Sequence, residues 1–263
     1  MSRGLVQALS RCRELFGSRK DPRLAVWEPF PPPLQPRAAL LATVLGQDLT
    51  IAGLARLLLE LRRALGDERL LGMAPCTRVS LGRACGERTW LVDWPHRASL
   101  DGWVLSAMDF LRVHGDPGTW RERFESPTNL VGTLALEIPW MGAGSPSRVK
   151  GWRLARWLVR GEVGAGWTEG ASELKTPVRV LERPLGALGW QPSGWDEWPR
   201  PRRQAWWDAM ASEVAPGDPA ALWVPLETVL ARGKAGPACQ EHLGGCGRCP
   251  VREWCPSPQR SAR

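Results

Sequence analysis

Apolar residues recur at helical spacing through most of the chain, so the hydrophobic pattern predicts a helical protein. Residues 37–66 carry two apolar stretches that are broken at Gly46-Gln47-Asp48, which predicts two consecutive helices. Further helices are expected at 5–16, 100–113, 129–136, 149–159, 205–214 and 222–231. No alternating strand pattern of useful length and no internal repeat is present. The predicted fold class is all-α.

Two segments interrupt the helical pattern. Prolines are dense between residues 29 and 36, and proline at that density cannot continue a helix, so a semi-rigid linker is expected there. Residues 161–201 are richer in Gly, Pro and Trp, which favours short helices mixed with loops.

Charge and composition narrow the class of partner. The chain of 263 residues has a formal net charge of +8, which favours a polyanionic partner but does not separate DNA from RNA. Sixteen Trp and no Tyr indicate mutational bias and core packing, with base stacking as the alternative. No apolar run approaches the roughly 20 residues that span a bilayer, and the first residues lack a secretory signal pattern. We expect a cytoplasmic, nucleoid-associated protein with no membrane partner.

Four cysteines near the C-terminus have the spacing C-x6-C-x2-C-x5-C, at Cys239, Cys246, Cys249 and Cys255. Four thiolates in one short loop are the usual ligand set of a [4Fe-4S] cluster. A zinc ribbon has two CxxC pairs, whereas here only Cys246 and Cys249 form one. The spacing therefore favours a [4Fe-4S] cluster, with structural zinc as the alternative.

This cysteine spacing resembles the cluster loop of endonuclease III and the adenine mismatch glycosylases, in the helix-hairpin-helix (HhH-GPD) DNA glycosylase superfamily. The resemblance implies a two-lobed helical fold with duplex DNA between the lobes, and we expect a monomer. In that arrangement residues 1–36 form an N-terminal helix and linker that pack on the C-terminal lobe. Residues 37–164 form a helical-barrel lobe, and residues 165–263 form the C-terminal lobe with the cluster loop at 239–255.

A second segment resembles the hairpin of this family, whose form is Leu-Pro-x-x-Gly followed by a helix. Here Ile138-Pro139-Trp140-Met141-Gly142 precedes a basic helix, although residues 143–147 are inserted between them. Backbone N–H groups in such a turn bind a DNA phosphate. The resemblance implies DNA contacts from the hairpin and from Gln47, which would fill the gap left by an extruded base. The candidate DNA-contact residues are Gln47, Pro139, Trp140, Met141, Gly142, Arg148, Lys150 and Arg153. The alternative for the hairpin is an ordinary loop before an amphipathic helix.

The catalytic positions depart from the family. The residue at the place of the family's Asp is Leu174 or Arg179, and neither replaces a carboxylate. Glu173 and Glu182 are the nearest acids, so both are weak candidates. Lys150, the lysine of the hairpin region, is the third weak candidate, and a phosphate contact is expected of it rather than attack on the sugar.

These features predict a protein of base excision repair that recognises damaged or mismatched bases in duplex DNA. It would act by base flipping and hydrolysis of the N-glycosidic bond, as a monofunctional glycosylase without lyase activity. The alternative is a catalytically inactive iron-sulfur DNA-binding relative. A third reading is an iron-sulfur nuclease or an RNA-binding protein outside this superfamily.

Overall fold

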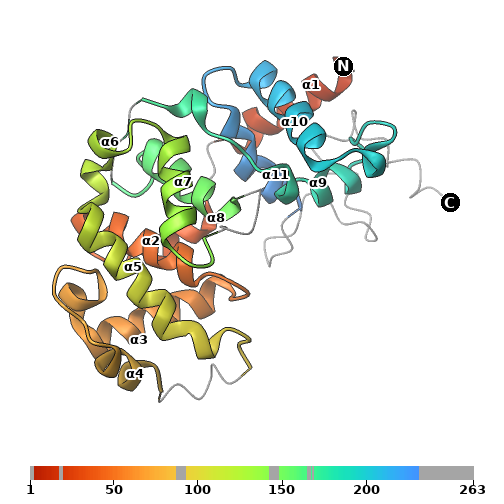
Figure 1. The fold of residues 1–263 in the computed structure, drawn as a ribbon. Helices are drawn as coiled ribbons and strands as arrows, with labels where there is room; N and C mark the ends of the chain where they lie inside the picture. The colour runs from red at the N-terminus through yellow and green to blue at the C-terminus, as the bar shows by residue number, and fades with distance from the viewer. Residues whose placement is uncertain are drawn as a thin grey trace. The chain divides into compact units, whose positions relative to one another are not determined.

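The computed structural model describes residues 3–17, 20–86, 93–141, 148–164, 167 and 169–230. All regular secondary structure within these residues is helical, so the all-α prediction is confirmed for this part of the chain (Figure 1). The chain divides into two compact units. Unit 1 contains residues 1–21 and 171–263, and unit 2 contains residues 22–170.

Unit 2 is built around α2 (Gln35–Leu45), which packs against α5 (Leu100–His114) and α8 (Val149–Val159). All but two of the residues of α2 are buried, because its sequence is apolar or small on every side. The neighbouring helices are α3 (Ile51–Leu70), α4 (Arg78–Gly86), α6 (Trp120–Arg123) and α7 (Pro127–Glu137). The 3-10 turns η1 (Pro22–Val26), η2 (Pro32–Leu34), η4 (Arg97–Ser99) and η5 (Pro117–Thr119) complete the unit. The break expected at Gly46-Gln47-Asp48 is confirmed, since α2 ends at Leu45 and α3 begins at Ile51.

The proline-rich segment is not the separate linker that the sequence suggested. Prolines 32 and 33 lie in η2, and Pro36 lies in the first turn of α2. Proline fits there because the first helical N–H groups have no partner within the helix. The segment belongs to unit 2, and the change of unit falls earlier in the chain, between residues 21 and 22.

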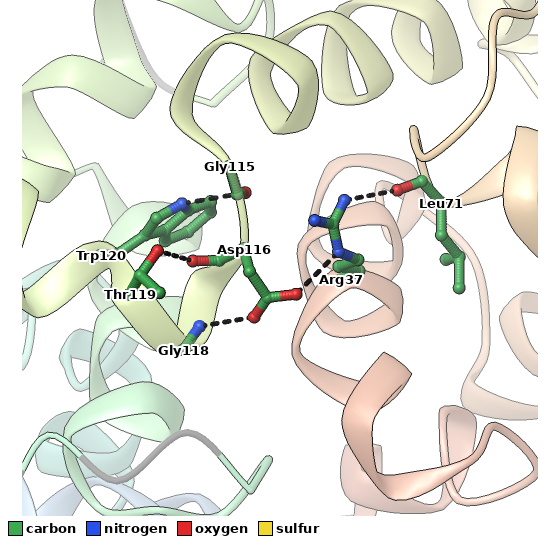
Figure 2. A network of polar contacts seen from close by, with 7 residues as sticks. All are labelled: Arg37, Leu71, Gly115, Asp116, Gly118, Thr119 and Trp120. Carbon is green, nitrogen blue, oxygen red and sulfur yellow. Dashed lines mark hydrogen bonds and ion pairs between the residues drawn. The ribbon is translucent and has the colours of Figure 1, made fainter.

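An arginine joins three elements of unit 2 (Figure 2). Arg37 on α2 pairs with Asp116 at 2.9 Å and donates to the Leu71 carbonyl at 3.0 Å. Asp116 also accepts from the Gly118 N–H at 2.8 Å, which caps η5. The side chain of Arg37 is only 11% exposed, so its charge depends on these partners. The contacts fix the ends of α3 and α5 against α2.

Unit 1 is a smaller helical core in which α1 (Arg3–Phe16) packs against α10 (Arg200–Val214) and α11 (Trp223–Leu230). Short elements precede α10, as expected for a segment rich in Gly and Pro: η6 (Ala171–Glu173), η7 (Val178–Val180), α9 (Glu182–Ala187) and η8 (Trp195–Glu197). The turn η9 (Pro219–Leu222) lies between α10 and α11. Leu9, Trp207 and Met210 are fully buried in this core. No helix in the described part of the chain is long and apolar enough to cross a membrane.

Candidate functional site

The connection between α2 and α3 presents Gln47 and Asp48 at the surface of unit 2. Its far end is fixed because the Thr50 hydroxyl caps α3 by accepting from the Gly53 N–H at 3.0 Å. Its centre is fixed by the indole of Trp94, which donates to the Gln47 carbonyl at 2.8 Å. These contacts define the position of the Gln47 backbone.

Asp48 is held by two donors on the same carboxylate oxygen. His96 Nε2 lies 2.9 Å from Asp48 Oδ2, and Gln47 Nε2 donates to that oxygen at 3.2 Å. The hydrogen bond with His96 is the main cause that lowers the pKa of Asp48, and the bond from Gln47 adds to it. Asp48 is therefore an ionised carboxylate at neutral pH, and its side chain is 56% exposed.

Lys150 lies in the first turn of α8 with its amine turned toward α2. Its Nζ donates to the Val44 carbonyl at 3.1 Å and lies 5.4 Å from the centre of the Trp103 ring. Burial lowers the pKa of Lys150 from 10.5 to about 8, although the charge of Asp48 opposes part of that fall. At pH 7 about a tenth of this amine is thus neutral, far more than for an ordinary surface lysine.

The Trp103 ring that lies beside this amine belongs to a group of aromatic rings. Trp103 is buried, and its ring lies 5.6 Å from Trp94, 5.0 Å from His96 and 5.7 Å from Trp140. Trp140 itself is 59% exposed, which makes it the outermost ring of the group. We call these residues the Lys150 cluster: Gln47, Asp48, Trp94, His96, Trp103, Trp140 and Lys150.

Backbone strain concentrates at this cluster. Among the described residues, four that are not glycine have a positive φ: Asp48 at 55°, Glu125 at 27°, Trp140 at 69° and Arg148 at 41°. Two of them belong to the Lys150 cluster, and Arg148 occupies the N-cap position of the helix that carries Lys150. Such conformations cost about 1–3 kcal/mol each and gather at functional sites. The strain therefore marks this face of unit 2 as a candidate site.

The helices on either side of the expected hairpin pack closely. Gly151 on α8 faces Val131 on α7, and a Cβ on that glycine would lie 3.1 Å from the valine Cγ1. Residues 142–147 of the connection, Gly142 among them, lie outside the described residues. The structure brings Trp140 of the turn and Lys150 of α8 into one cluster with Gln47.

The other residues that were expected to contact DNA differ in their exposure to solvent. Pro139 is exposed, and Arg148 and Arg153 are partly buried. Met141 is 1% exposed, so its side chain belongs to the core, and the DNA contact expected from it stays a prediction for its backbone. The basic face of α8 is also smaller than its sequence suggests, because Arg156 is buried and pairs with Glu162 at 3.1 Å.

The acids considered for catalysis lie in unit 1. Glu173 is exposed, and Glu182 pairs with Arg203 at 3.1 Å. Leu174 is buried and Arg179 is exposed, so neither position supplies a carboxylate. In unit 2 the carboxylate whose charge acts on Lys150 is Asp48. The sequence analysis did not identify Asp48, although this residue directly follows Gln47.

The cysteines at 239, 246, 249 and 255 lie outside the described residues, so the [4Fe-4S] cluster stays a prediction from their spacing. Within the described ranges, no group of three or more His, Cys, Asp or Glu side chains is placed to hold a metal ion.

Comparison with known proteins gives no family for this chain. No family model, no curated protein and no solved structure matches it.

Proposed function

We propose that this protein binds duplex DNA through the Lys150 cluster and recognises damaged or mismatched bases, as a diverged relative of the helix-hairpin-helix glycosylases. One observation carries the proposal. Gln47 and the segment that contains Trp140 and Lys150 are about 100 residues apart in the sequence, yet they meet in one strained and partly exposed cluster. The positive net charge of the chain supports a polyanionic ligand.

The cluster contains the groups that base extrusion requires. Extruding a base costs a few kcal/mol, and groups that fill the gap or stack on the neighbouring bases offset part of that cost. Gln47 is partly exposed and supplies an amide, while the exposed indole of Trp140 supplies a stacking surface. Arg148 at the N-cap of α8, two residues before Lys150, adds a cation to this part of the chain.

The lowered pKa of Lys150 favours a second, catalytic function. A neutral amine is a nucleophile, and burial is the usual way in which proteins obtain a neutral lysine. At an abasic site the ring-opened sugar has an aldehyde at C1′. The Lys150 nitrogen would add to that carbon, the oxygen would leave as water, and an imine would join protein and DNA. This proposal departs from the sequence-based expectation that lyase chemistry is absent.

Lys150→Gln tests the catalytic function. The wild-type protein and this variant are incubated with duplexes that contain an abasic site, uracil, an oxidised base, an alkylated base or a mismatch. Borohydride reduces an imine to a stable amine, so a covalent complex should form with the wild type and disappear in the variant. Lys175→Gln is the matched control, because Lys175 is an exposed lysine of unit 1.

Three results separate the possible functions. Covalent trapping that needs Lys150 supports the catalytic function. Lesion-dependent, salt-sensitive binding without trapping or base release favours the catalytically inactive DNA-binding relative. A preference for single strands or RNA over duplex DNA contradicts the proposal as a whole.

The [4Fe-4S] cluster is proposed on the cysteine spacing alone. We expect a brown protein with broad absorbance near about 400 nm and about four irons per chain, both lost in Cys246→Ala. Cys76→Ala is a suitable control, because this cysteine lies far from the quartet in the sequence. Stoichiometric zinc without iron contradicts this part of the proposal.

A further inference from the structure

We propose that Asp48 and Trp140 form a nucleobase site that selects an unpaired base with two adjacent N–H donors, the edge that guanine presents. This inference rests on the proposed DNA-binding function and adds a base preference to it.

Asp48 is placed as an acceptor that faces solvent. Its Oδ2 atom accepts hydrogen bonds from His96 and Gln47, whereas its Oδ1 atom accepts none from the described residues. The two donors on Oδ2 fix the orientation of the carboxylate, and the left-handed backbone at Asp48 projects it from the connection between α2 and α3. A fixed and exposed carboxylate is ready to accept hydrogen bonds from a ligand.

Trp140 supplies a flat surface close to this carboxylate. Its ring lies 6.3 Å from the ring of His96, which in turn lies 2.9 Å from Asp48. His96 therefore neighbours both the exposed indole and the carboxylate. In the proposed site a base stacks on the exposed indole and directs its edge toward Asp48.

The chemistry of a carboxylate decides which base is preferred. An ionised carboxylate only accepts hydrogen bonds. The Watson–Crick edge of guanine has two neighbouring donors, N1–H and the N2 amine, and both can donate to Oδ1, whose two lone pairs accept no hydrogen bond from the described residues. Adenine and cytosine place a ring acceptor beside their amine, and thymine places a carbonyl on each side of N3–H. These acceptors would oppose the negative charge of Asp48, so guanine is favoured.

The test uses duplexes in which one base faces a tetrahydrofuran abasic analogue. Affinity is measured by fluorescence anisotropy for guanine, adenine, cytosine or thymine at that place. We expect the wild type to bind the guanine duplex about tenfold more tightly than the others, a difference typical of one bidentate contact. Hypoxanthine in place of guanine removes the N2 amine and should abolish most of this preference.

Asp48→Asn should bind all four duplexes with similar affinity, because an amide presents a donor where the carboxylate presents an acceptor. Asp109→Asn is the control of equal charge change, since Asp109 is an exposed acid that pairs with Arg112 on α5. It should keep the guanine preference. If Asp48→Asn does not fold, the comparison of guanine with hypoxanthine on the wild-type protein still decides the matter.

Equal binding of guanine and hypoxanthine, or a preference that survives in Asp48→Asn, overturns this inference. If binding to the abasic-analogue duplexes still exceeds binding to intact duplex, the proposed function stands without the base preference. Absence of binding to every duplex overturns both.

Discussion

Replacement of Lys150 by methionine should stabilise the protein at neutral pH. The pKa of Lys150 falls from 10.5 in the unfolded chain to about 8 in the folded one. At about 1.4 kcal/mol for each factor of ten, the buried charge costs about 3 kcal/mol of folding free energy below pH 8. Methionine has a similar length and no charge, but it leaves the Val44 carbonyl without its donor, which costs about 1 kcal/mol. The expected net gain at pH 7 is about 2 kcal/mol.

The sign of this effect depends on pH. Between about pH 8 and 10.5 the unfolded chain holds a proton on Lys150 that the folded chain has released, so wild-type stability rises across this window. Above it the wild-type amine is neutral in both states and has no charge penalty. Lys150→Met should then be about 1 kcal/mol less stable than the wild type, because only the lost hydrogen bond remains.

Urea denaturation of the wild type and Lys150→Met at pH 7 and at about pH 11.5, above the window, measures both values. Lys175→Met is the control, and its exposed site should change stability by less than about 0.5 kcal/mol at either pH. A Lys150→Met variant that is less stable than the wild type at pH 7, or a stability difference between the two proteins that is the same at both pH values, would contradict a buried charge at Lys150.

Two further predictions concern the frame that holds the cluster. Arg37→Ala should lower stability by about 3 kcal/mol, because it leaves Asp116 and the Leu71 carbonyl without their buried partner. The control Arg112→Ala removes only an exposed ion pair and should cost less than about 0.5 kcal/mol. Equal losses in thermal unfolding would contradict a structural role for Arg37. Gly151→Ala should lower stability by about 1 kcal/mol, because the added methyl group meets Val131 on α7. The control Gly82→Ala on α4 adds a methyl group that meets nothing within 4 Å, so it should raise stability by up to about 1 kcal/mol. A gain in both variants would show that α7 and α8 are not closely packed.

Local pattern predicted most of the helices. The alternation of apolar and basic residues on α8 gave its bounds, Val149–Val159, without error. The break at Gly46-Gln47-Asp48 was equally informative, because it separates α2 from α3. The proline-rich segment was less predictable, since proline is compatible with a linker and with the first turn of a helix, and tertiary contacts decide between them.

The site was harder to predict because its contacts are distant in sequence. Gln47 and Lys150 were identified from motifs, but the pairing of His96 with Asp48 joins residues 48 positions apart and leaves no local pattern. The pKa of Lys150 depends on its burial near Trp103 and Val44, which no spacing reveals. Met141 lies in the hairpin motif, yet its side chain is buried in the core.

The central claim is that the Lys150 cluster is the surface that recognises a lesion in duplex DNA. Its most direct test compares the affinity of the wild type and Trp140→Ala for an intact duplex and for one with a tetrahydrofuran abasic analogue. Val113→Ala is the control, because Val113 is an exposed apolar residue near the end of α5 away from Trp103. We expect the wild type to prefer the abasic-analogue duplex, Trp140→Ala to lose about tenfold or more of that preference, and Val113→Ala to keep it. Equal preference in Trp140→Ala and the wild type would contradict the claim.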